Sequence, residues 1–257
     1  MSASISDAER LQRRNVLRLR ADNPGPLTMS GTNTWVVGRD PAWVVDPGPL
    51  LAKHQEALDA ALVERGGLGG IALTHDHIDH AESVTALRER FPAPLAAGRG
   101  SADVQLSDGE HFGPFQALYI PGHAPDHFAL IVDEVCFAGD AVLGEGSVFI
   151  APHPGALAGY LDGLARLLEL DLDVLCPGHG PPVWTPRERL CEYIEHRLDR
   201  ERRLVAAIAE GRRSTDELLD GAWSDVPVQL RPLAAVTLAA HLDKLAEENR
   251  LPLPFTR

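Results

Sequence analysis

The segment Thr74-His75-Asp76-His77-Ile78-Asp79-His80 decides the fold class of this chain and indicates its chemistry. It follows the apolar run Ile71-Ala72-Leu73, which predicts a short buried strand, and it opens a helix. In an extended strand end, side chains two residues apart project to the same side, so His75 and His77 share one side, while Asp79 and His80 fall on the first helical turn. Four imidazole or carboxylate donors within six residues suit a borderline divalent metal and are enough to begin two sites.

Three more potential ligands stand beside glycine at the ends of predicted strands. They are His123 in Pro121-Gly122-His123, Asp140 in Ala138-Gly139-Asp140 and His179 in Pro177-Gly178-His179-Gly180. Glycine has no Cβ, so it lets the backbone come close to a site. Together with the 74–80 segment these residues complete a set of five histidines and two aspartates.

Short β-like runs alternate with amphipathic helices up to about residue 185. Strands are predicted at 33–38, 42–46, 71–73, 116–120, 127–132, 135–138 and 173–176, with a hairpin turn at 38–41, and helices at 53–65, 81–91 and 157–168. This order is expected when helices cover sheets, so the sequence predicts a mixed α/β (α+β) domain over residues 1–185.

The pattern changes after Pro181-Pro182. Residues 187–210 are dense in Arg and Glu, and Ser214 with Glu217 has the form of a capping box that opens a helix. In a later helix Leu238, Leu242 and Leu245 share one face. We therefore expect a small C-terminal helical or winged-helix-like domain over residues 186–257.

Composition limits the classes of function. The chain has 257 residues, and 24 Lys and Arg against 37 Asp and Glu give a net charge of −13. Such a surface has no general attraction for nucleic acids or anionic lipids. No window approaches the ~18 apolar residues of a membrane span, and the first twenty residues lack the apolar core of a secretory signal. We expect a cytoplasmic protein without a membrane partner, whose three cysteines are reduced packing residues.

These motifs carry a resemblance to the metallo-β-lactamase superfamily, in its THxHxDH branch. Further matches lie at Gly31–Trp35 (GTNTW), Pro121–His127 (PGHAPDH) and Pro177–Pro181 (PGHGP), and the pattern is similar to the lactamase-beta-2-like proteins. The resemblance implies a four-layer αβ/βα sandwich. It also implies a first metal on His75, His77 and His123, a second on Asp79, His80 and His179, and Asp140 bridging both. Two zinc ions per chain are expected, with iron and manganese as alternatives because His and Asp accept all three.

The implied function is a hydrolase whose nucleophile is a hydroxide bridging the two metals, with Asp140 and Asp79 as catalytic residues. Asp79 has a second option as a proton shuttle to the leaving group. The family includes thioesterases acting on carrier-bound polyketides and a single-strand endoribonuclease. Because the chain is acidic, we favour an ester or thioester of a small or carrier-bound substrate over single-stranded RNA. A DNA-binding or scaffold protein that uses the C-terminal module is the non-enzymatic alternative, and apolar helices in that module permit a homodimer.

Several other residues receive an expected place. Asn33, Trp35 and His127 are expected to contact substrate or to support the metal ligands, with a structural role as the alternative for Trp35 and His127. Glu82, in Ala81-Glu82-Ser83 where relatives have a Gly-Gly stretch, is expected near the mouth of the site. The remaining histidines, expected at the surface or as caps, are His54, His111, His153, His196 and His241. The charged run Arg197, Arg200, Arg202 and Arg203 predicts a solvated helix face, the alternative being a track for phosphates.

Overall fold

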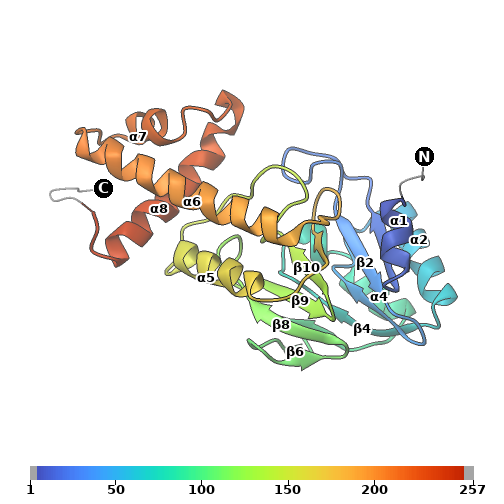
Figure 1. Ribbon diagram of the computed structural model, residues 1–257. Coiled ribbons are helices and arrows are strands. Elements are labelled where there is room, and N and C mark those ends of the chain that lie inside the picture. Colours follow the sequence, from blue (N-terminus) through green and yellow to red (C-terminus); the bar gives the residue numbers. More distant parts are fainter. Residues whose placement is uncertain (1–4, 252–257) are drawn as a thin grey trace. The chain divides into compact units, whose positions relative to one another are not determined.

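The computed structural model describes residues 5–251 and contains two compact units (Figure 1). The first unit comprises the chain up to Tyr119 together with Asp126–Gly146 and Asp171–Pro186, and the second comprises Ile120–Pro125, Ser147–Leu170 and the chain from Arg187 onward. The predicted domain boundary between residues 185 and 186 stays a prediction. By contacts, the second unit also takes in two segments that precede that boundary.

Two sheets form the first unit. One has the order β1 (Val16–Arg20), β2 (Asn33–Val37), β3 (Ala42–Val45), β4 (Leu68–Ala72), β5 (Leu95–Ala97), β6 (Val104–Gln105). The other has the order β11 (Val174–Pro177), β10 (Val135–Gly139), β9 (Phe128–Val132), β8 (Phe115–Tyr119), β7 (His111–Phe112). The helices of this unit are α1 (Asp7–Gln12), α2 (Ala52–Glu64), α3 (Ile78–Ala81) and α4 (Val84–Arg90).

Strand β2 shows how the layers of this unit form. Successive side chains of a strand point to opposite faces. Val36 packs with Leu58 of α2 and Leu87 of α4. Trp35 and Val37, which point to the opposite face, lie in the core between the two sheets. Because both faces of the strand are buried, Trp35, Val36 and Val37 form a continuous apolar run instead of an alternating one. The mixed α/β class predicted from the sequence is confirmed.

The second unit is helical. Its elements are α5 (Ala156–Leu168), α6 (Pro186–Ala209, which begins in the first unit), α7 (Thr215–Ala222), the 3-10 helix η1 (Val228–Leu230) and α8 (Arg231–Glu247), and Figure 1 shows α6 as its longest helix. The predicted capping box is confirmed, since Ser214 Oγ accepts from the Glu217 N–H and the Glu217 carboxylate accepts from the Ser214 N–H. The predicted face of α8 is buried against α6 and α7, with Leu242 among its residues.

Two expectations about charged and polar residues are wrong. Arg197 and Arg200 are buried, so α6 is not solvated along its whole arginine run, although Arg202 and Arg203 are exposed and pair with acidic residues of the same helix. His54 and His241 are also buried and do not lie at the surface.

The expectation that the three cysteines are packing residues is confirmed for two of them and is wrong for the third, which is exposed. Cys136 and Cys176 are buried and Cys191 is exposed, and all three are free thiols. None of the helices within residues 5–251 is both long enough and apolar enough to cross a membrane.

Candidate metal centre

The turn between β4 and α3 is held by a carboxylate at the end of β3. Asp46, which is 1% exposed, accepts hydrogen bonds from the Thr74 N–H at 2.8 Å and the Thr74 hydroxyl at 2.7 Å. Its Oδ2 atom also lies 2.9 Å from Nδ1 of His80. These contacts join the start of the 74–80 segment to its end, and they direct Nε2 of His80 away from Asp46.

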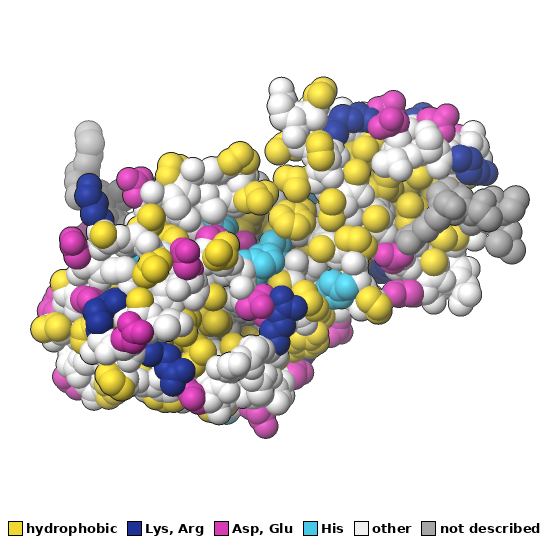
Figure 2. Space-filling model, turned by 180° about the vertical axis from the view of Figure 1, so that it is seen from behind, with side chains coloured by type: hydrophobic (Ala, Val, Ile, Leu, Met, Phe, Trp, Pro, Cys, Tyr) yellow, Lys and Arg dark blue, Asp and Glu magenta, His cyan; other side chains and the backbone are white. Residues whose placement is uncertain are grey.

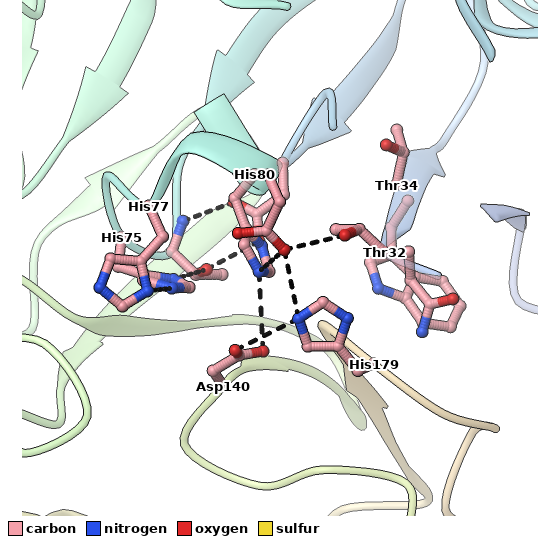
Figure 3. Close-up of polar contacts among 12 residues, drawn as sticks. Thr32, Thr34, His75, His77, His80, Asp140 and His179 are labelled. Atoms are coloured by element: carbon pink, nitrogen blue, oxygen red, sulfur yellow. Dashed lines mark hydrogen bonds and ion pairs between the residues drawn. The ribbon is translucent and has the colours of Figure 1, made fainter. Parts of the chain in front are cut away.

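The acidic and imidazole groups of the first unit converge on His80 (Figure 3). Asp79 Oδ2 lies 3.4 Å from His80 Nε2 and 3.3 Å from His179 Nε2. Asp140 Oδ1 lies 3.7 Å from His80 Nε2, and Asp140 Oδ2 lies 3.4 Å from His179 Nε2. Beside them, His75 Nε2 lies 3.0 Å from His77 Nδ1. Sequence positions as distant as 75 and 179 therefore supply one cluster.

Potential ligand atoms lie close enough together to share an ion. His75, His80 and Asp140 form one set, and Asp79, His80 and His179 form another, with the ligand atoms of each set within 4.8 Å of one another. Within residues 5–251, His80 Nε2 is a buried atom that has no hydrogen-bond partner. A buried imidazole nitrogen that faces two carboxylates fits a divalent cation better than it fits a hydrogen-bond network.

The glycines before the ligands are required by space. A Cβ atom on Gly178 would lie 2.3 Å from Asp140 Oδ1 and 2.6 Å from His80 Cε1. Gly139 has φ +49°, and a Cβ there would lie 2.5 Å from Thr74 Oγ1 and 2.7 Å from His127 Nε2. The predicted close approach of backbone to site is confirmed at both positions.

Charge at the cluster favours a cation. Burial opposes ionisation of Asp79, but the hydrogen bond to His179, the charge of His80 and the Thr32 hydroxyl outweigh it and lower the pKa of Asp79 to about 2. Burial also opposes protonation of His179, yet its contacts with Asp140 and Asp79 raise the pKa of His179 to about 10. The carboxylates thus favour positive charge at this point, and a divalent ion supplies such charge when its binding displaces protons.

His123 belongs to the second unit. It lies in the turn after β8, is 5% exposed, and its Nδ1 atom lies 3.4 Å from the carbonyl oxygen of Phe149. Its role as a ligand of the first metal, together with His75 and His77, stays a prediction.

Asn33 and Trp35 lie beneath the loop that carries His179. The Asn33 side chain, which is 0% exposed, donates to the carbonyl oxygens of Pro177 and Gly180, each at 2.9 Å. Trp35, 1% exposed, donates from Nε1 to the Pro177 carbonyl at 3.2 Å. Contact with a substrate requires exposure, so of the two roles expected for these residues, support of a ligand loop is the one that the geometry fits.

His127, the third residue of this expected group, supports the backbone at Asp140. It is 0% exposed, and its Nε2 atom accepts a hydrogen bond from the Asp140 N–H at 3.1 Å. The acceptor nitrogen fixes the backbone on which the Asp140 carboxylate stands.

Several polar residues at the site were not singled out from the sequence. Asp46 was visible only as the polar end of the run Ala42–Asp46. Thr32 donates its hydroxyl to Asp79 Oδ2 at 2.9 Å. Asp126, in the PGHAPDH segment, accepts from the Asp76 N–H at 3.0 Å, and Arg99 binds the Asp76 carboxylate through two donors at 2.7 Å.

The surface near the cluster is partly apolar. Figure 2 shows histidine side chains at the surface of the molecule, with hydrophobic, acidic and basic side chains on the same face. His77 is partly exposed, and the side chain next to it, Ile78, is 72% exposed. Glu82, expected at the mouth, accepts from the Leu50 N–H at 2.8 Å, so its carboxylate is engaged with the chain itself.

Comparison with known families identifies the class. Residues 27–113 and 101–179 match the metallo-beta-lactamase superfamily, and residues 214–251 match the beta-lactamase associated winged helix domain. The matched segments cover more than half of the chain, so it belongs to the metallo-beta-lactamase superfamily and is a hydrolase of that superfamily. The predicted fold and its C-terminal winged-helix domain are confirmed.

Individual relatives are similar over most of their length. The beta-lactamase-like protein 2 homolog of Caenorhabditis elegans is 28% identical, over 93% of this chain and 86% of the relative. An atrochrysone carboxyl ACP thioesterase of Aspergillus chevalieri is 30% identical, over 81% of this chain and 70% of the relative. These matches confirm the predicted branch.

Two solved structures share the fold. A beta-lactamase domain protein from Burkholderia ambifaria has a TM-score of 0.78 and 21% identity, over 91% of this chain and 86% of the other. TTHA1623, solved in a di-iron-bound form, has a TM-score of 0.54 and 28% identity, over 67% of this chain and 96% of the other. The second shows that a member of this fold holds iron, so the fold does not dictate zinc.

Proposed function

We propose that this chain is a dinuclear metal-dependent hydrolase that acts on an ester or thioester of a small or carrier-bound substrate. The observation that carries the proposal is the position of Asp140, whose carboxylate lies within 4.8 Å of ligand atoms of both His75 and His80. It is thus adjacent both to the His75 and His77 pair and to the group of Asp79, His80 and His179. We assign the first ion to His75, His77 and His123, the second to Asp79, His80 and His179, and the bridge to Asp140.

The chemistry of the site follows from its donors. Two divalent ions held there would lower the pKa of a shared water toward roughly 7 and polarise the oxygen of the group under attack. Hydrolysis adds a hydroxyl to the acyl carbon, breaks the bond to oxygen or sulfur, and returns a proton to the leaving atom. Asp79, half buried and held by the Thr32 hydroxyl, is the residue we assign to that proton transfer.

A thiol nucleophile does not fit the cysteines that lie inside the fold. Cys136 and Cys176 are both buried, and burial raises the pKa of Cys136 to about 12 and also raises that of Cys176. A buried thiol of raised pKa is a poor nucleophile at neutral pH. Activation of water by metal is therefore the mechanism that the buried groups favour.

Two observations favour an acyl substrate. One similar protein is named an ACP thioesterase and is 30% identical to this chain. Three of the arginines that could bind a phosphate backbone are engaged within the chain, because Arg99 binds Asp76, and Arg197 and Arg200 are buried within the second unit. Single-stranded RNA and a DNA-binding or scaffold role are accordingly the outcomes against which the proposal is tested.

The test begins with metal analysis of protein purified without chelator, for which we expect close to two ions of zinc, iron or manganese per chain. The same protein is then incubated with a panel of acyl-pantetheine thioesters and, separately, with a labelled single-stranded RNA. We expect thiol release from thioesters in wild type and its loss in Asp140→Asn.

Each other result contradicts a defined part of the proposal. Activity without bound metal overturns the metal mechanism. If the wild-type protein cleaves RNA but leaves the thioesters intact, and the cleavage is lost in Asp140→Asn, the substrate is single-stranded RNA and not an acyl compound. Binding of DNA or of a protein without any hydrolysis favours the non-enzymatic alternative.

A further inference from the structure

Arg197 is a buried charge on the middle of α6. Its side chain is 2% exposed, and its Nη2 atom donates to the carbonyl oxygen of Val148 and, at 3.1 Å, to the hydroxyl of Ser147. Burying a guanidinium is costly unless it is well hydrogen-bonded. An arginine at this position is therefore tied to the 147–150 segment.

Helix α8 holds the same segment from a second side. The Ile150 N–H donates to the hydroxyl of Thr237 at 3.2 Å, and Thr237 is 3% exposed. Two different helices, α6 through Arg197 and α8 through Thr237, thus hold positions 148 and 150. Phe149 is the residue between those two points of attachment.

Phe149 contacts His123 directly. Its carbonyl oxygen lies 3.4 Å from His123 Nδ1, and the two ring centroids are 5.0 Å apart. A histidine that donates one ring N–H to a backbone carbonyl has its tautomer and orientation fixed, and it presents the opposite nitrogen to a metal. Phe149 is therefore placed to select the Nε2 face of His123.

The turn that carries His123 also packs on the neighbour of Arg197. Gly122 has φ +137°, and a Cβ there would lie 2.7 Å from the Cβ of Tyr160 in α5. Tyr160 is 0% exposed, and the Arg197 guanidinium lies 5.7 Å from the centroid of its ring. Arg197 thus contacts both supports of His123, one through Val148 and one through Tyr160.

We propose that Arg197 is a positioning residue for the first metal, acting through His123. This inference rests on the proposed dinuclear function, and it gives the C-terminal helices a role in building the metal centre. Arg197 does not touch metal or substrate in this account. It fixes the Phe149 carbonyl and the Tyr160 ring, which fix the imidazole.

Arg200 provides a matched control on the same helix. It is 4% exposed, but it donates to the Ala222 carbonyl at 2.6 Å and to Asp225 at 2.5 and 2.7 Å. Arg197→Gln and Arg200→Gln each remove a buried guanidinium, so both are expected to lower the melting temperature. The two arginines differ in their partners: Arg197 contacts the 147–150 segment, whereas Arg200 contacts Ala222 and Asp225.

The experiment measures metal affinity by chelator competition and the visible absorption of the cobalt-substituted protein. Loss of a residue that orients a metal-binding histidine typically weakens affinity about 10–100-fold. We expect that weakening for one of the two ions in Arg197→Gln, a changed cobalt spectrum, and partial recovery in Arg197→Lys. Arg200→Gln should bind both ions as wild type does.

Combination with His123→Ala separates this role from general loss of structure. If Arg197 acts through His123, adding Arg197→Gln to His123→Ala weakens metal binding no further. The inference is overturned if Arg197→Gln binds both ions normally, if Arg200→Gln is weakened equally, or if the double variant loses a further 10-fold. A wild-type protein that binds no metal would instead overturn the proposed function itself.

Discussion

Nδ1 of His80 lies 2.9 Å from Oδ2 of Asp46, and both side chains are buried. The contact joins the end of β3 to the first turn of α3. It fixes which nitrogen of His80 faces Asp79 and Asp140. The orientation of a residue in the 74–80 segment is thus determined by a carboxylate 34 positions earlier in the chain.

Replacement of Asp46 should weaken metal binding. In Asp46→Asn one of the three donors around this carboxylate would face an amide N–H2 group, because the Thr74 N–H, the Thr74 hydroxyl and His80 all contact its oxygens. We expect affinity to fall about 10–100-fold, measured by chelator competition. Asp59→Asn, which alters a partly exposed ion pair between Asp59 of α2 and Arg90 of α4, should leave affinity unchanged. Equal affinity in Asp46→Asn and wild type would contradict the positioning role.

A methyl group at Gly178 should displace the ligands. Gly178→Ala places a Cβ within 2.3 Å of Asp140 Oδ1 and within 2.6 Å of His80 Cε1. Overpacking of this kind costs about 1–3 kcal/mol, and we expect at least one ion to be lost in metal analysis. Gly109→Ala is the control, because its φ of +79° brings backbone strain of roughly 1–2 kcal/mol without any atom within 4 Å of the new Cβ. The glycine account fails if both variants keep two ions.

Loss of the amide beneath the His179 loop should cost more than loss of the neighbouring indole N–H. Asn33→Leu removes the side-chain donor to the Gly180 carbonyl, at about 1–3 kcal/mol for a buried group left unpaired, and one of two side-chain donors to the Pro177 carbonyl. Trp35→Phe removes only the other donor to Pro177. Denaturant unfolding of metal-free protein measures the difference. An Asn33→Leu variant as stable as Trp35→Phe would show that the two bonds do not hold the loop.

Acid should destabilise the second unit through His241. Burial, and after it the charges of Arg197 and Lys244, lower the pKa of His241 to about 3, against about 6.5 when it is unfolded. Between those values the unfolded chain binds more protons, so stability falls as pH falls, by up to about 1.4 kcal/mol per pH unit for this group. Unfolding free energies between pH 7 and 4 should fall less steeply in His241→Phe. Parallel slopes would assign the acid sensitivity to other groups.

Much of the centre could be predicted because its donors are concentrated. The 74–80 segment carries four of them. Gly139-Asp140 and Gly178-His179 are recognisable because each is a glycine followed by a potential metal ligand at the end of a strand. Asp46 gave no such signal, since a single polar residue after an apolar strand is common. Its importance depends on the parallel pairing of β3 with β4, which brings Val45 beside Ala72.

In the helices, by contrast, the sequence did not predict which charged side chains are buried. The arginine run from Arg197 to Arg203 was predicted to lie on a helix, as it does in α6, but its alternation with acidic residues gave no indication of which arginines are buried. Arg197 is buried where it donates to the Val148 carbonyl and the Ser147 hydroxyl, and Arg200 where it donates to the Ala222 carbonyl at the end of α7. Short strands such as β5, three residues of Leu and Ala, also escape prediction because they lack a period to detect.

The wall beside Asp140 and His80 is made of backbone at Gly178, where there is no room for a side chain. Any side chain introduced at this position would collide with Asp140 and His80, so this part of the site cannot change without disturbing the candidate metal ligands. The neighbouring surface at Ile78, 72% exposed, is under no such constraint. During evolution the substrate of this protein could therefore change through substitutions at exposed positions such as Ile78. The residues around Gly178, which determine the type of reaction, would stay the same.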